Sequence, residues 1–340
     1  MSSSRATILR RDLDIVSMTG LEIGPLADPV VRKSEGRVVY VDHTDTESLR
    51  TTYRDNALVE PADIVDVDAI WGDRTLAEAL APLLGDGARI DYVVASHVAE
   101  HVPDLVTWLA EVTDVLRPGG TLRLALPDRR FSFDALRGPT RLVDTLAAWV
   151  VRARKPQVRD VLDFRLHYAP DVRPFGIYDG TDRRDELVPA HSFDKVVEIA
   201  GWARDLDVYL DVHCTVAHPR EWAELMAGLA ELGLLRMACV EMIDTTTEMF
   251  EFYVVMTPCA DHAHAVSSWR TAATAMADPL PGSVEAQMAE AMRAQAKQLP
   301  GLQATVAGLT AELAEARARV VGLEQSRSWR LTAPLRRLKR

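Results

Sequence analysis

The feature that most constrains the fold is a pair of short apolar runs, each followed by a residue suited to a ligand site. Residues 19–28 read TGLEIGPLAD, with Gly24 directly after the first run, and residues 38–43 read VVYVDH, with Asp42 at the end of the second. The eighteen residues from Gly24 to Asp42 leave room for a crossover between parallel strands. Because open parallel sheets bind ligands at the carboxyl ends of their strands, we expect these two residues to lie side by side.

Two further apolar runs follow at distances typical of βαβ units. IDYVVASHVAEH occupies residues 90–101, and LRPGGTLRLALPD occupies residues 116–128. Strands that alternate with helices predict an α/β fold with a parallel sheet, closed here by a final hairpin. The expected strands are 19–23, 37–41, 62–67, 90–95, 121–125, 237–243 and 251–257. The expected helices are 5–16, 75–84, 104–116, 142–152, 192–202 and 220–234.

Together the four segments resemble the class I S-adenosylmethionine-dependent methyltransferases. The resemblance implies a Rossmann-like sheet of seven strands, with S-adenosylmethionine as the cofactor. It places an acid on the cofactor ribose, an acid on the adenine amino group and a strand-tip residue beside the methyl group. The cofactor-binding residues it implies are Glu22, Gly24, Pro25, Asp42, Asp68 and Ser96, with Asp66 and Trp71 as nearby alternatives to Asp68.

The loop after the first strand departs from the pattern of that family. The family usually shows an acid and then glycines at alternate positions, and Leu26 and Asp28 stand where the later glycines would be. We expect a helix beginning near residues 26–31 to offer free N–H groups to a carboxylate. A nicotinamide dehydrogenase would also use an acid such as Asp42, but it needs a complete G-x-G-x-x-G loop for the pyrophosphate, which is missing.

Methyl transfer to a hydroxyl requires a group that takes the proton, and two histidines are candidates for this base. His97 follows the fourth strand, and His213 lies in the segment YLDVHCTVAHP at 209–219. An imidazole titrates near neutral pH, although a structural role for either histidine stays open. Glu100 and His101 beside His97 suggest a metal site. The H-E-x-x-H order is absent and no third ligand has a fixed place, so we expect no metal.

The segment LPDRRFSFDALRGPT at 126–140 resembles a narrower group, bacterial methyltransferases encoded with polysaccharide-assembly enzymes. Residues 40–50, 70–73 and 209–219 extend this resemblance. It implies a sugar, glycan or sugar-nucleotide acceptor methylated at a hydroxyl, and aromatic and charged side chains after the fifth strand suit a sugar. The expected acceptor-binding residues are Arg129, Arg130, Phe131 and Arg137. A solvated loop, a small-metabolite acceptor and a non-catalytic adapter remain alternatives.

We divide the chain by composition and periodicity. The expected parts are a cofactor-binding half (1–128), an inserted cap (129–219), the closing helix and hairpin (220–257), a linker (258–283), a helical coiled-coil segment (284–326) and a basic tail (327–340). Apolar residues from 302 to 323 keep a heptad seam that predicts self-association or packing onto the body. The tail resembles ends of bacterial glycan-assembly proteins, which implies contact with an anionic membrane surface or a protein; a disordered basic end is the alternative.

Charge and hydropathy restrict the partners. The net charge is −11, and the last fourteen residues carry six basic residues and no acid, which leaves −17 on the rest. An acidic body argues against a nucleic-acid substrate. The chain has no apolar run near the roughly 18 residues that span a bilayer, and no secretory signal, so we expect a cytoplasmic protein that contacts the membrane peripherally. Cys214, Cys239 and Cys259 lack metal-ligand spacing and are expected as buried small hydrophobes.

Overall fold

The computed structural model describes residues 2–56, 59–173, 177, 186–206, 208–246, 249–276, 308, 317–319 and 321–322. The chain divides into two compact units, residues 1–278 and 279–340. The predicted coiled coil at 284–326 and the basic tail at 327–340 lie almost wholly outside the described residues. Within the described part, none of the helices combines the length and the apolar character needed to cross a bilayer.

The first unit is built on a seven-stranded sheet with the order β3-β2-β1-β4-β5-β7-β6. The strands are β1 Thr19–Ile23, β2 Arg37–Asp42, β3 Ala69–Ile70, β4 Ile90–Ser96, β5 Leu116–Pro127, β6 Met237–Ile243 and β7 Glu251–Pro258. The first five strands are parallel, and β7 runs antiparallel to both β5 and β6. The seven-stranded Rossmann-like sheet and its closing hairpin are therefore confirmed.

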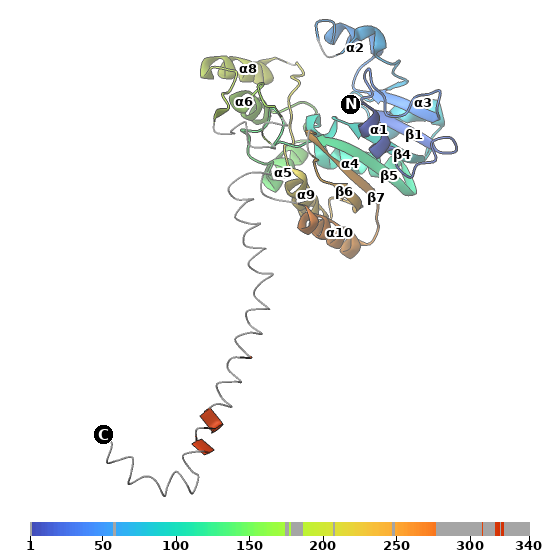
Figure 1. Cartoon of the computed structure of the whole chain (residues 1–340). Helices are drawn as coiled ribbons and strands as arrows, with labels where there is room; N and C mark the ends of the chain where they lie inside the picture. The colour runs from blue at the N-terminus through green and yellow to red at the C-terminus, as the bar shows by residue number, and fades with distance from the viewer. Residues whose placement is uncertain are drawn as a thin grey trace, which may run out of the picture. The chain divides into compact units, whose positions relative to one another are not determined.

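Helices cover the two faces of the sheet unequally (Figure 1). The helices are α1 Ser2–Leu9, α2 Thr46–Thr52, α3 Leu76–Leu84, α4 Leu105–Val115, α5 Leu142–Val150, α6 Val158–His167, α8 Phe193–Asp205, α9 Pro219–Glu231 and α10 His262–Ala275. The main core joins one face of the sheet to α3, α4, α9 and α10. On the other face, Leu9 of α1 and two valines of the loop after β1, Val30 and Val31, pack on Tyr40 and Tyr92.

The third strand and the crossover after β1 differ from the expectation. We expected the third strand at 62–67, but β3 is Ala69–Ile70. The side chain of Ile64 is buried, while its carbonyl accepts a hydrogen bond from Arg50 and Val65 N–H donates to the carbonyl of Leu26. The apolar run therefore packs against neighbouring loops instead of pairing with β2. Residues 24–36 cross to β2 without the helix expected near 26–31.

The linker expected at 258–283 is wrong for residues 262–275, because these form helix α10. Trp269 of α10 is fully buried in the main core, and its Nε1–H donates to the carbonyl of Met237 at 2.9 Å. An apolar ring that also satisfies a strand carbonyl fixes the helix to β6. Helix α10 thus belongs to the folded unit.

Residues 129–219, which we expected as an inserted cap, include helices α5, α6 and α8 among their described residues, and a small core of their own. Figure 1 shows α6 and α8 lying together, apart from the sheet, and the two helices share that core. Val161 and Phe164 of α6 meet Ile199 of α8 there, together with Cys214 of the following loop. The helix α6 was not predicted. Cys214 is buried as expected, whereas Cys239 and Cys259 are partly exposed.

Candidate active site

The carboxyl ends of four parallel strands meet at one edge of the sheet. Ile23 at the end of β1 lies between Val41 and Ala95 in register, and Ser96 of β4 lies opposite Ala125. Gly24 N–H donates to the carbonyl of Val41 at 2.9 Å. Gly24 and Asp42 are therefore neighbours, as the sequence predicted, at the edge where ligands of such sheets bind.

The turn after β1 has a left-handed backbone at Gly24 and again at Leu26, although only the first of these residues is a glycine. Gly24 has φ of 65°, and a Cβ there would lie 2.7 Å from a Val98 methyl carbon. Leu26 also adopts a positive φ, 46°, where the resembled family carries a glycine. A non-glycine residue in this conformation costs of the order of 1–2 kcal/mol, and such strain gathers at functional sites. Pro25 is buried at the start of a turn that Asp28 N–H closes on the Pro25 carbonyl.

Glu22 stabilises the loop after β1 through hydrogen bonds to its backbone. Its side chain is buried, and its two carboxylate oxygens accept hydrogen bonds from Val30 N–H at 2.6 Å and Val31 N–H at 3.0 Å. Burial raises the pKa of Glu22 to about 7, although the two backbone hydrogen bonds oppose the shift. Both oxygens are committed to the chain itself. The structure thus gives Glu22 a supporting role in place of the expected contact with a cofactor.

Asp42 keeps one oxygen available at the strand tip. Its Oδ1 accepts hydrogen bonds from the backbone N–H and the Nδ1–H of His43, both at 2.7 Å. Its Oδ2 accepts none from the described residues. The His43 ring stacks on Tyr209 with centroids 5.7 Å apart, and the hydrogen bond to Asp42 raises the pKa of His43. A carboxylate with a free oxygen suits a ligand hydroxyl.

Asp68, the residue expected to meet the adenine amino group, is engaged elsewhere. Its Oδ2 accepts a hydrogen bond from Tyr40 N–H at 2.9 Å, and its Oδ1 forms an ion pair with Lys33 at 2.6 Å. The carboxylate thus stabilises the end of the loop before β3 against β2. As it stands, it is not free to accept a hydrogen bond from a ligand.

His97 follows β4 in a strained conformation, with φ of 55°. Its Nε2 lies 2.6 Å from Glu251, and its Nδ1 lies 3.4 Å from Glu100. Burial by itself would lower the pKa of His97, but the two carboxylates outweigh it and raise the pKa to about 9. The imidazole is therefore protonated at neutral pH, which argues against His97 as the base. Beside it, Ser96 Oγ is buried without a hydrogen-bond partner among the described residues.

Glu251, which the sequence analysis missed, organises this corner of the site. It is almost fully buried at the start of β7 and accepts hydrogen bonds from Arg5 of α1 and from the Tyr253 hydroxyl. Burial would raise its pKa, but His97, Arg5 and Tyr253 together lower the pKa to about 2. An acid that opens an otherwise apolar strand, EFYVVMTP, was the available signal.

The loop at 208–218 crosses the carboxyl edge of the sheet from β2 to β5. Near β2, Tyr209 stacks on His43, and near β5, Ala217 forms a bridge with Asp128. Between these points the backbone N–H groups of Cys214 and Thr215 both donate to the carbonyl of Glu100. The loop therefore carries His213 to the turn Ala99–His101, more than one hundred residues away in sequence.

His213 is held in one orientation by an acid. Its Nδ1 lies 2.6 Å from Asp134 Oδ2, and its ring meets the His101 ring edge to face with centroids 4.6 Å apart. Burial would raise the pKa of Asp134, but His213 and Arg137 lower it, so the carboxyl stays ionised. With Nδ1 occupied, Nε2 is the nitrogen left to accept a proton or bind a cation. His213 is thus better placed than His97 to act in the chemistry.

The residues expected to bind the acceptor serve as internal supports. These residues are Arg129, Arg130, Phe131 and Arg137. The first arginine pairs with Glu221 at 2.7 Å, the second pairs with the fully buried Asp128, and the third bonds both Asp134 and Asp163. The phenylalanine ring is buried. Their charges are neutralised and their surfaces covered, so this structure does not present them to a sugar.

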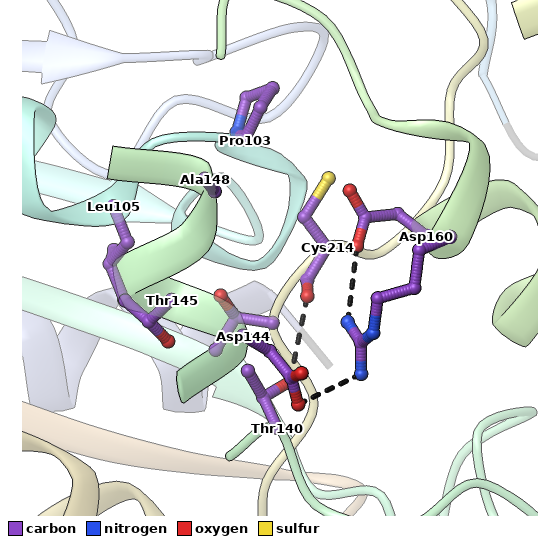
Figure 2. Close-up of a pocket in the computed structure, with 10 residues that line it drawn as sticks. Pro103, Leu105, Thr140, Asp144, Thr145, Ala148, Asp160 and Cys214 are labelled. Carbon is purple, nitrogen blue, oxygen red and sulfur yellow. Dashed lines mark hydrogen bonds and ion pairs between the residues drawn. The ribbon is translucent and has the colours of Figure 1, made fainter. Parts of the chain in front are cut away.

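A crevice beside the His213 loop is too small for an acceptor (Figure 2). It lies between α5, the start of α6 and Cys214, where Arg159 bridges Asp144 and Asp160. Thr140 Oγ1–H donates to the carbonyl of Cys214 at 3.5 Å. The space holds about one water molecule.

Comparison with known proteins identifies the class. Residues 13–124 match the family model described as a methyltransferase domain. The search of curated proteins finds no sequence match. The matched region carries the five parallel strands, and the antiparallel β7 completes the seven-stranded sheet. The chain thus contains a methyltransferase domain at residues 13–124, and its cofactor is S-adenosylmethionine.

Several solved structures are similar over about three quarters of the chain. The CcbJ methyltransferase from Streptomyces caelestis is 13% identical, with 76% of this chain and 96% of that chain covered and a TM-score of 0.37. The DhpI complex with SAH is 14% identical, with 76% and 85% covered and a TM-score of 0.35. A methyltransferase from Clostridium acetobutylicum is 8% identical, with 76% and 98% covered and a TM-score of 0.35.

Proposed function

We propose that this enzyme transfers a methyl group to a hydroxyl of a sugar, glycan or sugar-nucleotide acceptor in polysaccharide biosynthesis. The observation that carries the proposal is the cluster of Glu100, His101 and His213 at the carboxyl edge of the sheet. A loop from the inserted segment brings His213 there, close to the strand ends where the cofactor of such a sheet binds. Groups that can accept or donate a proton thus lie beside the proposed position of the methyl group.

The strand ends offer three features that fit the cofactor. Among the described residues, Asp42 has an oxygen without a hydrogen bond that suits ribose hydroxyls, and the buried Ser96 hydroxyl has no partner. Gly24 lacks a side chain where a Cβ would crowd Val98. We assign these three residues to cofactor binding. When bound, S-adenosylmethionine supplies a methyl group already activated by the sulfonium charge. The protein therefore contributes mainly positioning, exclusion of water and control of a proton.

The proton of the acceptor hydroxyl has to leave during the reaction. Transfer forms an oxygen–methyl bond, breaks the methyl–sulfur bond and releases that proton. His97 is already protonated, so we assign proton handling to the cluster that contains His213. Its orientation by Asp134 resembles the pairing that prepares a histidine for acid–base work.

A sugar fits the surroundings of this cluster. The stacked rings of His43 and Tyr209 lie beside Asp42, and about 43% of Tyr209 is exposed. Exposed aromatic faces next to carboxylates suit the alternating apolar and hydroxyl surfaces of a pyranose. The sequence segments that resemble polysaccharide-associated methyltransferases support the same acceptor class.

The C-terminal segments provide the partners in this proposal. Residues 284–326 would join copies of the chain through their heptad seam, and residues 327–340 would contact an anionic membrane surface or a glycan-assembly protein. The enzyme would then work in the cytoplasm at the inner face of the membrane.

The test is a methylation assay with an acceptor panel. Purified enzyme is incubated with S-adenosylmethionine and nucleotide sugars, monosaccharides, oligosaccharides and small hydroxylated metabolites, and products are identified by mass spectrometry. We expect a mono-methylated sugar, lost in Asp42→Ala and retained in Asp86→Ala, which removes an exposed carboxylate from the turn after α3. Methylation of a non-sugar metabolite alone would contradict the proposed acceptor.

A further inference from the structure

One oxygen of Glu100 and one ring nitrogen each of His101 and His213 all lie within 4.8 Å of one another. Two of these residues come from the turn after β4, and the third comes from the loop at 208–218. The sequence analysis expected no metal because no third ligand had a fixed place. The fold supplies that third ligand.

The Glu100 side chain forms an ion pair with His97 but has no hydrogen bond among the described residues. Only 2% of the residue is exposed, and neither carboxylate oxygen has a hydrogen-bond partner among the described residues. The nearest positive group is His97 Nδ1, at 3.4 Å and outside hydrogen-bond geometry. A carboxylate removed from water without hydrogen bonds is costly, and buried charges are normally paired or bound to a metal.

An acid lies beside one ring nitrogen of each histidine. The Nδ1 of His213 is hydrogen-bonded to Asp134 at 2.6 Å, and the Nδ1 of His101 lies 2.7 Å from Asp211 as an ion pair outside hydrogen-bond geometry. A carboxylate on one ring nitrogen fixes the tautomer and leaves the other nitrogen for the cation. Each histidine of the cluster therefore has its own acid, which favours a defined position for its ring.

We propose that Glu100, His101 and His213 bind a divalent transition-metal ion. Two imidazoles and one carboxylate suit ions from Mn²⁺ to Zn²⁺ better than Mg²⁺ or Ca²⁺, which prefer oxygen ligands alone. Three protein ligands leave coordination positions open, as in catalytic metal sites. His213 is then a ligand in the metal-bound enzyme.

The role of the metal rests on the function proposed above. An acceptor hydroxyl at an open position would have its pKa lowered, so that its proton passes to water before transfer. Neighbouring hydroxyls of a sugar could occupy two open positions at once.

The test measures metal binding without cofactor or acceptor. Full-length protein is stripped with a chelator and titrated calorimetrically with Zn²⁺ and with Mn²⁺, and Co²⁺ absorption reports the ligand geometry. We expect one Zn²⁺ per chain, with affinity reduced at least about 100-fold in Glu100→Gln and His213→Ala. His264→Ala is the matched control, because His264 is exposed on α10, and should bind as the wild type does.

A further variant guards against misfolding. Asp211 has a side chain that is 64% exposed, so Asp211→Asn should leave the fold intact, checked by circular dichroism, while weakening Zn²⁺ about 10-fold or more. Equal binding by wild type and the Glu100, His213 and Asp211 variants, or no binding by the wild type, would overturn the site. Metal binding without sugar methylation would contradict only the acceptor. Sugar methylation by a stripped enzyme that binds no metal would contradict only the metal.

Discussion

Glu22 gives the sharpest prediction about stability, because its charge is buried beneath the cofactor turn. Its pKa is about 7 in the folded protein, against 4.5 for an ordinary glutamate. A carboxyl whose pKa is raised on folding stabilises the protein at low pH, and this contribution is lost as pH rises through the folded pKa. With these two pKa values, the loss between about pH 5.5 and about pH 8 is roughly 2 kcal/mol.

The assay is urea unfolding of wild type and Glu22→Gln across that pH range. Glutamine does not titrate, so the difference between the two unfolding free energies should change by roughly 2 kcal/mol, with the wild type losing stability relative to the variant as pH rises. Glu35→Gln is the matched control from the same loop. Hydrogen bonding from Arg32 N–H, ahead of an opposing effect of burial, holds the pKa of Glu35 below its usual value, so it titrates below the tested range. A flat difference for Glu22→Gln would refute the claim that the buried carboxyl titrates near neutrality.

Three other outcomes follow from the structure. His97→Ala should lower turnover, because it removes the cation that pairs with Glu100 and Glu251, while S-adenosylhomocysteine affinity stays nearly unchanged, measured by initial rates and calorimetry; full activity would show that this pairing is not needed for the reaction. Trp269→Ala should destabilise the protein by about 3–5 kcal/mol in urea unfolding, and a change near zero would show that α10 is dispensable. Deletion of 284–340 should leave a folded, cofactor-binding body by circular dichroism and calorimetry, because the chain divides near residue 278; an unfolded product would place the deleted segment in the core.

The strands that carry the site could be predicted because their apolar runs are long and their ends are marked by turn residues. The run at 90–95 is covered on both faces of the sheet, and nothing competes with the strand assignment there. The third strand was misplaced because residues 62–67 are as apolar as a strand but bury Ile64 through loop packing. Local hydrophobicity reports burial and does not by itself report hydrogen-bond pairing.

Helix α10 was missed for the opposite reason. Residues 262–275 are rich in alanine and serine, with a weak apolar face, and were assigned to a linker. A single buried ring, Trp269, together with its hydrogen bond to Met237, fixes the helix to the sheet. Such an anchor is a tertiary contact, which helical periodicity does not reveal.

The sequence predicted where the site residues lie in the fold better than it predicted what each side chain does. Gly24, Asp42 and Ser96 lie at the strand ends as expected, because parallel strands bring their carboxyl ends together. The protonation of His97 depends on Glu251, which is 154 residues away in the chain. The meeting of His213 with Glu100 likewise depends on a loop that crosses the sheet. Sequence spacing contains neither contact.

The most direct test of the central claim is calorimetric titration of the purified protein with S-adenosylhomocysteine, beside Asp42→Ala and the control Asp86→Ala, whose carboxylate is exposed. Asp42→Ala removes the carboxylate oxygen that would accept hydrogen bonds from the ribose hydroxyls. This should cost roughly 1.5–3 kcal/mol of binding free energy, which is about a 10- to 150-fold weaker affinity. We predict micromolar binding by the wild type and by Asp86→Ala, and the weaker affinity just stated in Asp42→Ala. No binding by the wild type, or equal binding by all three proteins, would contradict a cofactor site at the ends of β1, β2 and β4.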